Sequence, residues 1–184
     1  MNTQENKKLH ASATKGFTLI ELLVVIAIIA ILATTVIATL GAARAKNRDA
    51  VRYSDMIQLR TAINRYFTEN GSYPNTGNVW YSSEAGDVFG NNSGNWIPGL
   101  VAAKMIPGLP GDPLPGLSTN PNCTAAGYKR DFLYKSDATG THFKLLANCS
   151  LEGNYPAATN QWYDVTRPTW AIQTTDNATV TSAW

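Results

Sequence analysis

The sequence predicts an α+β fold, in which one long N-terminal helix, at about residues 17–70, packs on a small antiparallel sheet with irregular C-terminal loops. Three observations support this. An apolar run covers residues 17–40, an amphipathic pattern follows it, and two strand-like segments flank a turn between residues 128 and 147. Hydrophobic periodicity of this kind is the main sequence signal for helices and strands.

The apolar run is long enough to cross a membrane. Residues 17–40 contain no Gly or Pro and one charged residue, Glu21. As a helix, about 24 residues extend roughly 36 Å, which exceeds a hydrocarbon core of about 30 Å. Lysines in residues 1–16 precede the run and place that end in the cytoplasm by the positive-inside rule. The sequence therefore predicts a cytoplasmic leader, a span and an extracytoplasmic remainder.

The residues themselves allow two interpretations of this run. A cleaved secretory signal fits the basic start and the small residues Ala-Ala-Arg-Ala at 42–45. The apolar region of such a signal is only about 7–15 residues long, however, and this run is longer. A plain single-pass anchor fits the length. In that case Thr18 and Glu21 form a capping box, because their Thr-x-x-Glu spacing satisfies N–H groups at a helix start.

A third interpretation comes from resemblance. The segment Gly-Phe-Thr-Leu-Ile-Glu-Leu at residues 16–22 resembles the class III signal of type IV pilins and type II secretion pseudopilins, and the similarity continues to Leu32. In that family a prepilin peptidase cuts after the residue that matches Gly16 and methylates the new N-terminus, here Phe17. The resemblance implies a pilin-like fold and removal of the leader, residues 1–16.

The residue types at this junction suit such processing. Gly16 has no side chain, so its backbone can enter a protease site in an extended form. A carboxylate close to the bilayer, such as Glu21, needs a partner. By the resemblance, the Phe17 amine of one subunit meets Glu21 of its neighbour and sets the register of a helical filament.

The second half of the predicted helix, residues 41–70, is amphipathic. Met56, Leu59, Ile63 and Phe67 recur at helical spacing and are joined by Ala62 and Tyr66. The basic residues from Arg44 to Arg65 are expected on a solvated face with partners on neighbouring subunits, and DNA or anionic lipid are the alternative partners. Asn70-Gly71 supplies the stop signal.

Residues 71–184 form the predicted globular head. A polar loop covers residues 75–99, and Leu-Pro-Gly-Asp-Pro at 109–113 is similar to an element of pseudopilins and minor pilins. Aromatic and aliphatic residues around a turn at 136–140 predict a hairpin at about 128–147. A further edge strand is expected around residues 169–174.

Cys123 and Cys149 flank this hairpin, and flanking positions of an antiparallel pair come close together. A disulfide is therefore expected, because the predicted topology places both residues in an oxidising compartment. The alternative is two free thiols. Closing the loop would contribute about 3 kcal/mol of stability.

No catalytic motif is recognisable, so the sequence predicts a protein that is not an enzyme. His10 falls in the leader and His142 on a strand surface. No cofactor is predicted; calcium stays open, because carboxylates could be assembled from Asp131, Asp137 and Asp176 without a clear ligand set. A net charge of +2 does not favour nucleic acid as a partner. Tryptophans are expected to fill the core or, alternatively, to form a binding surface: Trp80, Trp96, Trp162 and Trp170.

Three functions follow from these observations. The leading one is a structural subunit of a type IV pilus-like filament, held in the inner membrane before assembly and polymerised through residues 17–40. Its implied partners are prepilin peptidase, further copies of the chain, and an inner-membrane assembly platform with its ATPase. The alternative is a G-like type II secretion pseudopilin. A second alternative, from another class, is a single-pass anchored binding module, which requires neither cleavage nor a filament.

Overall fold

The computed structural model describes residues 16–86, 89, 94–118, 123, 129–153 and 169–174. The leader before Gly16 lies outside these residues, as do Trp162, Asp176 and the last ten residues. The chain divides into two compact units, Met1–Gly41 and Ala42–Trp184, which we describe separately.

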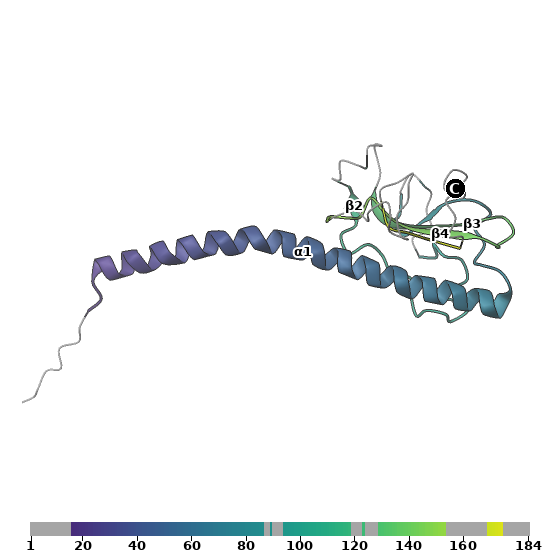
Figure 1. Ribbon diagram of the computed structural model, residues 1–184, viewed down its shortest axis with the longest axis horizontal. Helices are drawn as coiled ribbons and strands as arrows, with labels where there is room; N and C mark the ends of the chain where they lie inside the picture. Colours follow the sequence, from purple (N-terminus) through teal and green to yellow (C-terminus); the bar gives the residue numbers. More distant parts are fainter. Residues whose placement is uncertain are drawn as a thin grey trace, which may run out of the picture. The chain divides into compact units, whose positions relative to one another are not determined.

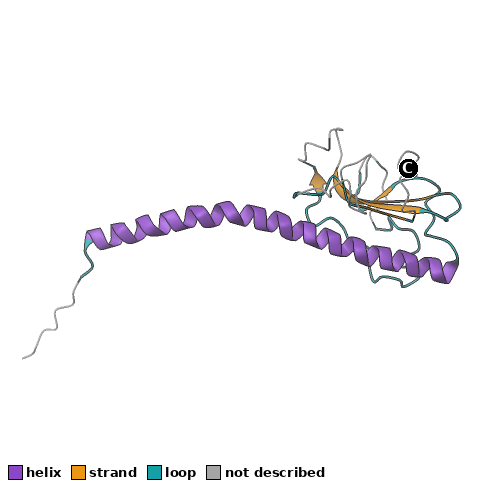
Figure 2. Cartoon of the chain, viewed as in Figure 1, coloured by secondary structure: helices purple, strands orange, loops and turns teal. Residues whose placement is uncertain are grey.

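A single long helix, α1, runs from Leu19 to Asn70, as the sequence predicts (Figures 1 and 2). It ends where expected, because Gly71 adopts a φ of 75° that side-chain-bearing residues rarely take. The Gly71 N–H donates to the Phe67 carbonyl over 2.8 Å, so the glycine caps the last turn.

The strands within the described residues, five in number, build one antiparallel sheet, of which β2, β3 and β4 are labelled in Figure 1. The sheet order is β1–β3–β4–β5, and β2 pairs with the other end of β3. This arrangement confirms the predicted α+β fold with a long helix and a small antiparallel sheet. The bounds are β1 Tyr81–Ser82, β2 Gly116–Leu117, β3 Lys129–Ser136, β4 Phe143–Asn148 and β5 Ala171–Gln173.

The central hairpin of β3 and β4 forms as predicted, but β4 begins two residues later than expected. Asp137 explains the difference. Its carboxylate accepts the N–H groups of Thr141 at 2.7 Å and His142 at 3.3 Å, which removes both donors from the strand ladder. His142 consequently lies in the turn rather than on a strand, with Nδ1 3.1 Å from Asp137.

The main core lies between the second half of α1 and one face of the sheet. Alternate residues of β3 and β4 point toward the helix, as the twofold repeat of a strand requires. Trp96 from the polar loop is fully buried, and its ring stacks on Phe132 with centroids 5.9 Å apart. The core residues are Met56, Leu59, Ala62, Ile63, Trp96, Ile97, Leu100, Phe132, Tyr134, Phe143, Leu145, Ala147 and Ile172.

A second, smaller cluster lies on the other face of the sheet. Leu133, Leu146 and Ala171 are buried there, and Trp80 and Phe89 pack against them. The tryptophans within the described residues therefore take part in packing, the first of the two roles expected from the sequence. Phe67 departs from its expected place on the buried helix face: it is 37% exposed and stacks on Tyr73 at the helix end.

Candidate functional site

The N-terminal segment presents its predicted processing residues openly. Gly16 and Phe17 precede α1, and the Phe17 side chain is 87% exposed. Among the described residues, no atom would lie within 4 Å of a Cβ placed on Gly16. Both residues are thus sterically accessible to an enzyme.

Glu21 lies one turn into this segment and forms a reciprocal capping box with Thr18. Its Oε2 accepts the Thr18 N–H and the Thr18 hydroxyl, each over 2.8 Å, while the Glu21 N–H donates to Thr18 Oγ1 over 3.3 Å. These bonds satisfy donors that a helix start leaves unpaired. They use one carboxylate oxygen, and the exposed side chain can therefore accept an additional cation.

The apolar half of α1 is not packed against any other part of the described chain. Its aliphatic side chains are exposed, and the helix is long and apolar enough to cross a membrane. The hydroxyls of Thr34, Thr35 and Thr39 donate to carbonyls three or four residues earlier, so they need no outside partner. This surface suits burial in lipid or among other helices.

The head holds a second candidate site, a buried ion cluster around Arg52. The Arg52 guanidinium is fully buried and binds Asp112 through two bonds of 2.8 Å, in a bidentate arrangement. Its Nη1 also donates to Asp49 over 2.7 Å and to Glu152 over 2.9 Å. Arg48 adds a bond from Nε to Glu152 Oε1 over 2.6 Å. We call these five residues the Arg52 cluster.

Three distant segments meet in the Arg52 cluster. Asp112 belongs to the Leu-Pro-Gly-Asp-Pro element and turns the chain by accepting the Leu114 N–H over 2.8 Å. Asp49, on α1, accepts the N–H groups of Glu152 at 3.2 Å and Gly153 at 2.8 Å. The cluster therefore joins α1 to the segment that precedes β2 and to the segment that follows β4.

The cluster corrects one expectation from the sequence. Arg52 and Asp49 are buried and Arg48 is half-buried, so the prediction of a fully solvated basic face was wrong for this part of the helix. A sequence signal was available. Asp49 and Arg52 lie seven and four residues before Met56, in register with the apolar stripe that reaches the core.

The cluster also perturbs the ionisation of its members. Hydrogen bonds from Arg48, and then from Arg52, lower the pKa of Glu152 to about 2. Burial opposes the charge of Arg52, but hydrogen bonds to Asp112 and the other acids outweigh it and raise its pKa. Both groups thus stay ionised at neutral pH.

Acid is therefore expected to weaken the head. Because the pKa of Glu152 is lower in the folded chain than its usual 4.5, its contribution to stability is present above pH 4.5 and lost as the pH falls toward 2. Thermal unfolding of the full-length chain in detergent, followed by circular dichroism across this range, measures the effect. The variant Glu152→Gln should flatten the acid limb, whereas the exposed Glu69→Gln should leave it unchanged. If Glu152→Gln lost stability in acid as steeply as the wild type, the assignment of this stabilisation to ionised Glu152 would be contradicted.

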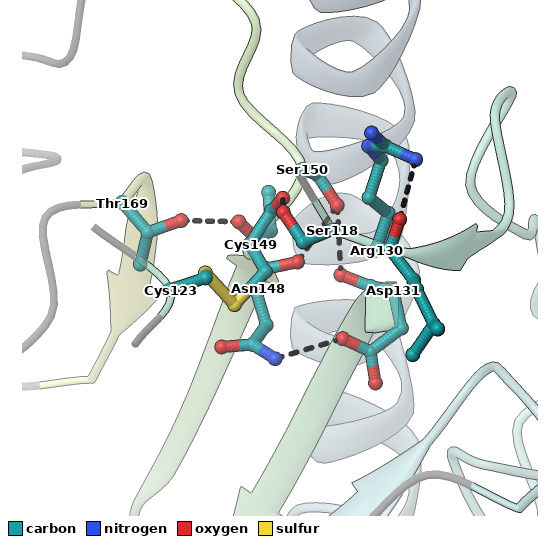
Figure 3. The surroundings of a disulfide bond; sticks show 10 residues. Ser118, Cys123, Arg130, Asp131, Asn148, Cys149, Ser150 and Thr169 are labelled. Carbon is teal, nitrogen blue, oxygen red and sulfur yellow. Dashed lines mark hydrogen bonds between the residues drawn. A yellow bond between two sulfur atoms is a disulfide. The ribbon is translucent and has the colours of Figure 1, made fainter. Parts of the chain in front are cut away.

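Cys123 and Cys149 form a disulfide with Cα atoms 5.7 Å apart (Figure 3). Around it, the Ser118 hydroxyl donates to the Cys149 carbonyl over 2.8 Å, and the Thr169 hydroxyl donates to the Ala147 carbonyl. The bond and its neighbours thus tie the end of β4 to the segments next to β2 and β5.

Two of the three carboxylates considered for calcium, Asp131 and Asp137, lie at opposite ends of β3, and the third, Asp176, lies outside the described residues. Asp131 lies at the start of β3, where it binds Ser82 and Asn148, and Asp137 follows the end of the same strand. Within the described residues, no three His, Cys, Asp or Glu side chains are grouped as a metal site would require.

Comparison with known proteins places the N-terminal segment in a recognised class. Residues 12–37 match the family described as prokaryotic N-terminal methylation motif. This match includes Gly16, Phe17 and Glu21, and together with the relatives below it confirms the resemblance to pilins and pseudopilins. The match and the relatives support the prediction that the protein is a structural subunit rather than an enzyme.

Three curated relatives are each named type II secretion system core protein G. The chain is 37% identical over 62 residues to the protein from Pectobacterium carotovorum, over 34% of this chain and 40% of that protein. Identity is 39% to the proteins from Escherichia coli and Aeromonas hydrophila, over 34% and 33% of this chain and 43% of each relative. The chain thus spans about two fifths of the length of the relatives it matches. No solved structure matches.

The comparisons and the fold together support a pilin-like or pseudopilin subunit with an apolar N-terminal helix that fits a membrane-anchored protein. Between the two functions within this class, the relatives favour pseudopilin, the alternative in the sequence analysis, over the pilus subunit placed first there.

Proposed function

We propose that the chain is a G-like pseudopilin, a structural subunit that polymerises into a short filament of a type II secretion system. The observation that carries this proposal is the likeness to three core G proteins over about a third of the chain, together with the methylation motif at residues 12–37. The exposed apolar half of α1 supports it, because such a surface requires lipid before assembly and other helices afterwards.

Processing would proceed at the accessible junction. Prepilin peptidase cuts after Gly16, removes residues 1–16 and methylates Phe17. The leader lies in the cytoplasm, residues 17–40 span the inner membrane, and the head lies outside it. The cut creates an amine at Phe17, and the exposed Glu21 of a neighbouring copy supplies the matching charge. Residues 41–70 then continue α1 into the head, and an assembly platform with its ATPase extracts subunits into the filament.

A type IV pilus subunit is the second candidate. The disulfide supports it, together with the part of the chain, about two thirds, that the core G relatives do not match. Deleting the chain from its host separates the two candidates: a pseudopilin is needed for export of secreted proteins, whereas a pilus subunit is needed for surface filaments.

The first test is the N-terminus of the native protein. Intact mass and N-terminal sequencing of protein from its own membrane should give a chain that begins at N-methylated Phe17. A peptidase-deficient strain should retain residues 1–16. The variant Gly16→Val should also retain them, because a branched side chain obstructs the extended backbone at the cut. A chain that still begins at Met1 while other substrates are processed would contradict the proposal and favour the anchored binding module.

A further inference from the structure

Asp55 is a carboxylate on α1 that the head does not neutralise. It is half-buried, and in the described part of the chain it makes no hydrogen bond or ion pair. Burial, and then the nearby charge of Asp112, raise its pKa. The single copy therefore holds this acid in an unfavourable environment, since Asp112 already has Arg52 as its partner.

Lys46, on the same helix, is a cation that the described part of the head does not neutralise. Its side chain is exposed, and none of the described residues forms an ion pair with it. The neighbouring cations differ, because Arg48 and Arg52 are taken up by Glu152, Asp49 and Asp112. Folding of the head thus leaves an exposed cation and a half-buried acid without partners, nine residues apart.

Nine residues amount to about two and a half turns of a helix, so Lys46 and Asp55 lie on opposite sides of α1. Groups on opposite sides cannot meet within one helix, but they face each other when identical helices pack side by side in the same direction. Such a contact is heterologous, and repeated without closure it builds an open helical filament. Each copy would offer Lys46 to one neighbour and Asp55 to the other.

We propose that Lys46 of one copy forms an ion pair with Asp55 of the next copy, so that a second copy of this chain is the partner for both residues. The proposal rests on the proposed function, because it requires copies that assemble through parallel α1 helices. Arg44 does not serve in place of Lys46, since its eleven-residue separation from Asp55 puts both on nearly the same side of the helix.

The axial spacing agrees with the register proposed for the N-terminus. If the Phe17 amine of one copy meets Glu21 of its neighbour, the two helices are offset by four residues, or about 6 Å. Lys46 of the same copy then lies five residues short of Asp55 of that neighbour, about 7.5 Å along the axis. The flexible four-carbon stem of lysine can cover most of this gap. One copy would thus present the two cations, the Phe17 amine and Lys46, and its neighbour the two acids, Glu21 and Asp55.

Cysteine cross-linking in cells tests the contact directly. The full-length double variant Lys46→Cys and Asp55→Cys, expressed with its assembly machinery and treated with a bis-maleimide that spans about 8 Å, should give a ladder of linked multimers, because the axial offset is too long for a direct disulfide. The matched control, Arg44→Cys with Asp55→Cys, places both thiols on one side of the helix and should give no ladder. No ladder in the first variant, or equal ladders in both, would overturn the pairing.

Charge exchange tests its contribution to assembly. Lys46→Glu and Asp55→Lys should each reduce filament yield several-fold, and the combined variant should restore most of it. Asp55→Asn should also reduce the yield, whereas the unfolding temperature of its unassembled chain stays equal or rises, since an unfavourable charge is removed. A structural role alone would lower that temperature.

The same experiment separates this inference from the proposed function. Wild-type filaments that disappear in Glu21→Gln but are unaffected by either single charge reversal would overturn the Lys46–Asp55 pair and leave the pseudopilin proposal intact. If the wild-type chain forms no filament when the machinery assembles other subunits, the proposed function fails first.

Discussion

Replacing Arg52 by alanine is expected to lower the free energy of unfolding of the head by about 3–5 kcal/mol, which is large compared with a typical total of about 5–15 kcal/mol. Arg52 and Asp112 are both fully buried as side chains. Removing the cation leaves a buried carboxylate that no longer has its bidentate partner, and Asp49 and Glu152 lose a donor as well. Chemical unfolding of the full-length chain in detergent measures the loss.

Arg65 supplies the matched control for this prediction. It also lies on α1 and pairs with an acid, Glu69, over 3.0 Å, but its side chain is 63% exposed. Because an exposed pair on a helix contributes only about 0.3–0.5 kcal/mol, Arg65→Ala should change stability little. Equal effects of Arg52→Ala and Arg65→Ala would contradict the view that the Arg52 cluster stabilises the head.

A double substitution separates the contribution of the two charges to stability from the contribution of the side-chain volume that they fill. Arg52→Met with Asp112→Leu removes both charges and replaces them with apolar side chains. Buried ion pairs exchanged in this way often cost little, since neither member of the pair is left alone. Asp49 and Glu152 still lose the Arg52 donor, so the double variant should lie between Arg52→Ala and the wild type in stability.

Breaking the disulfide should be the second large effect. Cys123 and Cys149 are 26 residues apart, and by loop-closure entropy their bond should contribute about 3 kcal/mol to stability. Cys123→Ser should therefore lower the denaturant concentration at which the head unfolds, and reduction of the wild-type chain should have the same effect.

The double variant is the internal control for the disulfide. The cross-link is lost once either cysteine is replaced, so Cys123→Ser with Cys149→Ser should cost little more than Cys123→Ser alone. Reductant should no longer affect the double variant. A wild-type chain whose unfolding is the same with and without reductant would show that the bond contributes nothing measurable.

The elements predicted correctly are those with local signals. The buried stripe of α1 follows from helical spacing, and Gly71 ends the helix because it alone there tolerates a positive φ. The β3–β4 hairpin follows from apolar segments around a turn, and even its error is local, since Asp137 takes the N–H groups of Thr141 and His142. The N-terminal motif was recognisable for the same reason, as its residues are consecutive.

The sequence did not reveal what depends on distant partners. Arg52 binds Asp112, 60 residues away, and Glu152, 100 residues away, and nothing near Arg52 in the sequence marks those partners. Trp96 was expected to fill the core, but nothing near it in the sequence marks Phe132 of β3 as the ring on which it stacks. The strands β1 and β2 have two residues each, too few for an alternating pattern to appear.

The separation of the Arg52 partners also sets an order of events during synthesis. A chain made from its N-terminus completes α1 long before Glu152 exists, because Arg52 and Glu152 are 100 residues apart. Until then Arg48 and Arg52 lack Glu152, one of the acids that neutralise them in the folded head. Synthesis of the C-terminal third is thus the step at which the Arg52 cluster obtains its last acid, and premature termination before Glu152 would leave the cluster permanently without it.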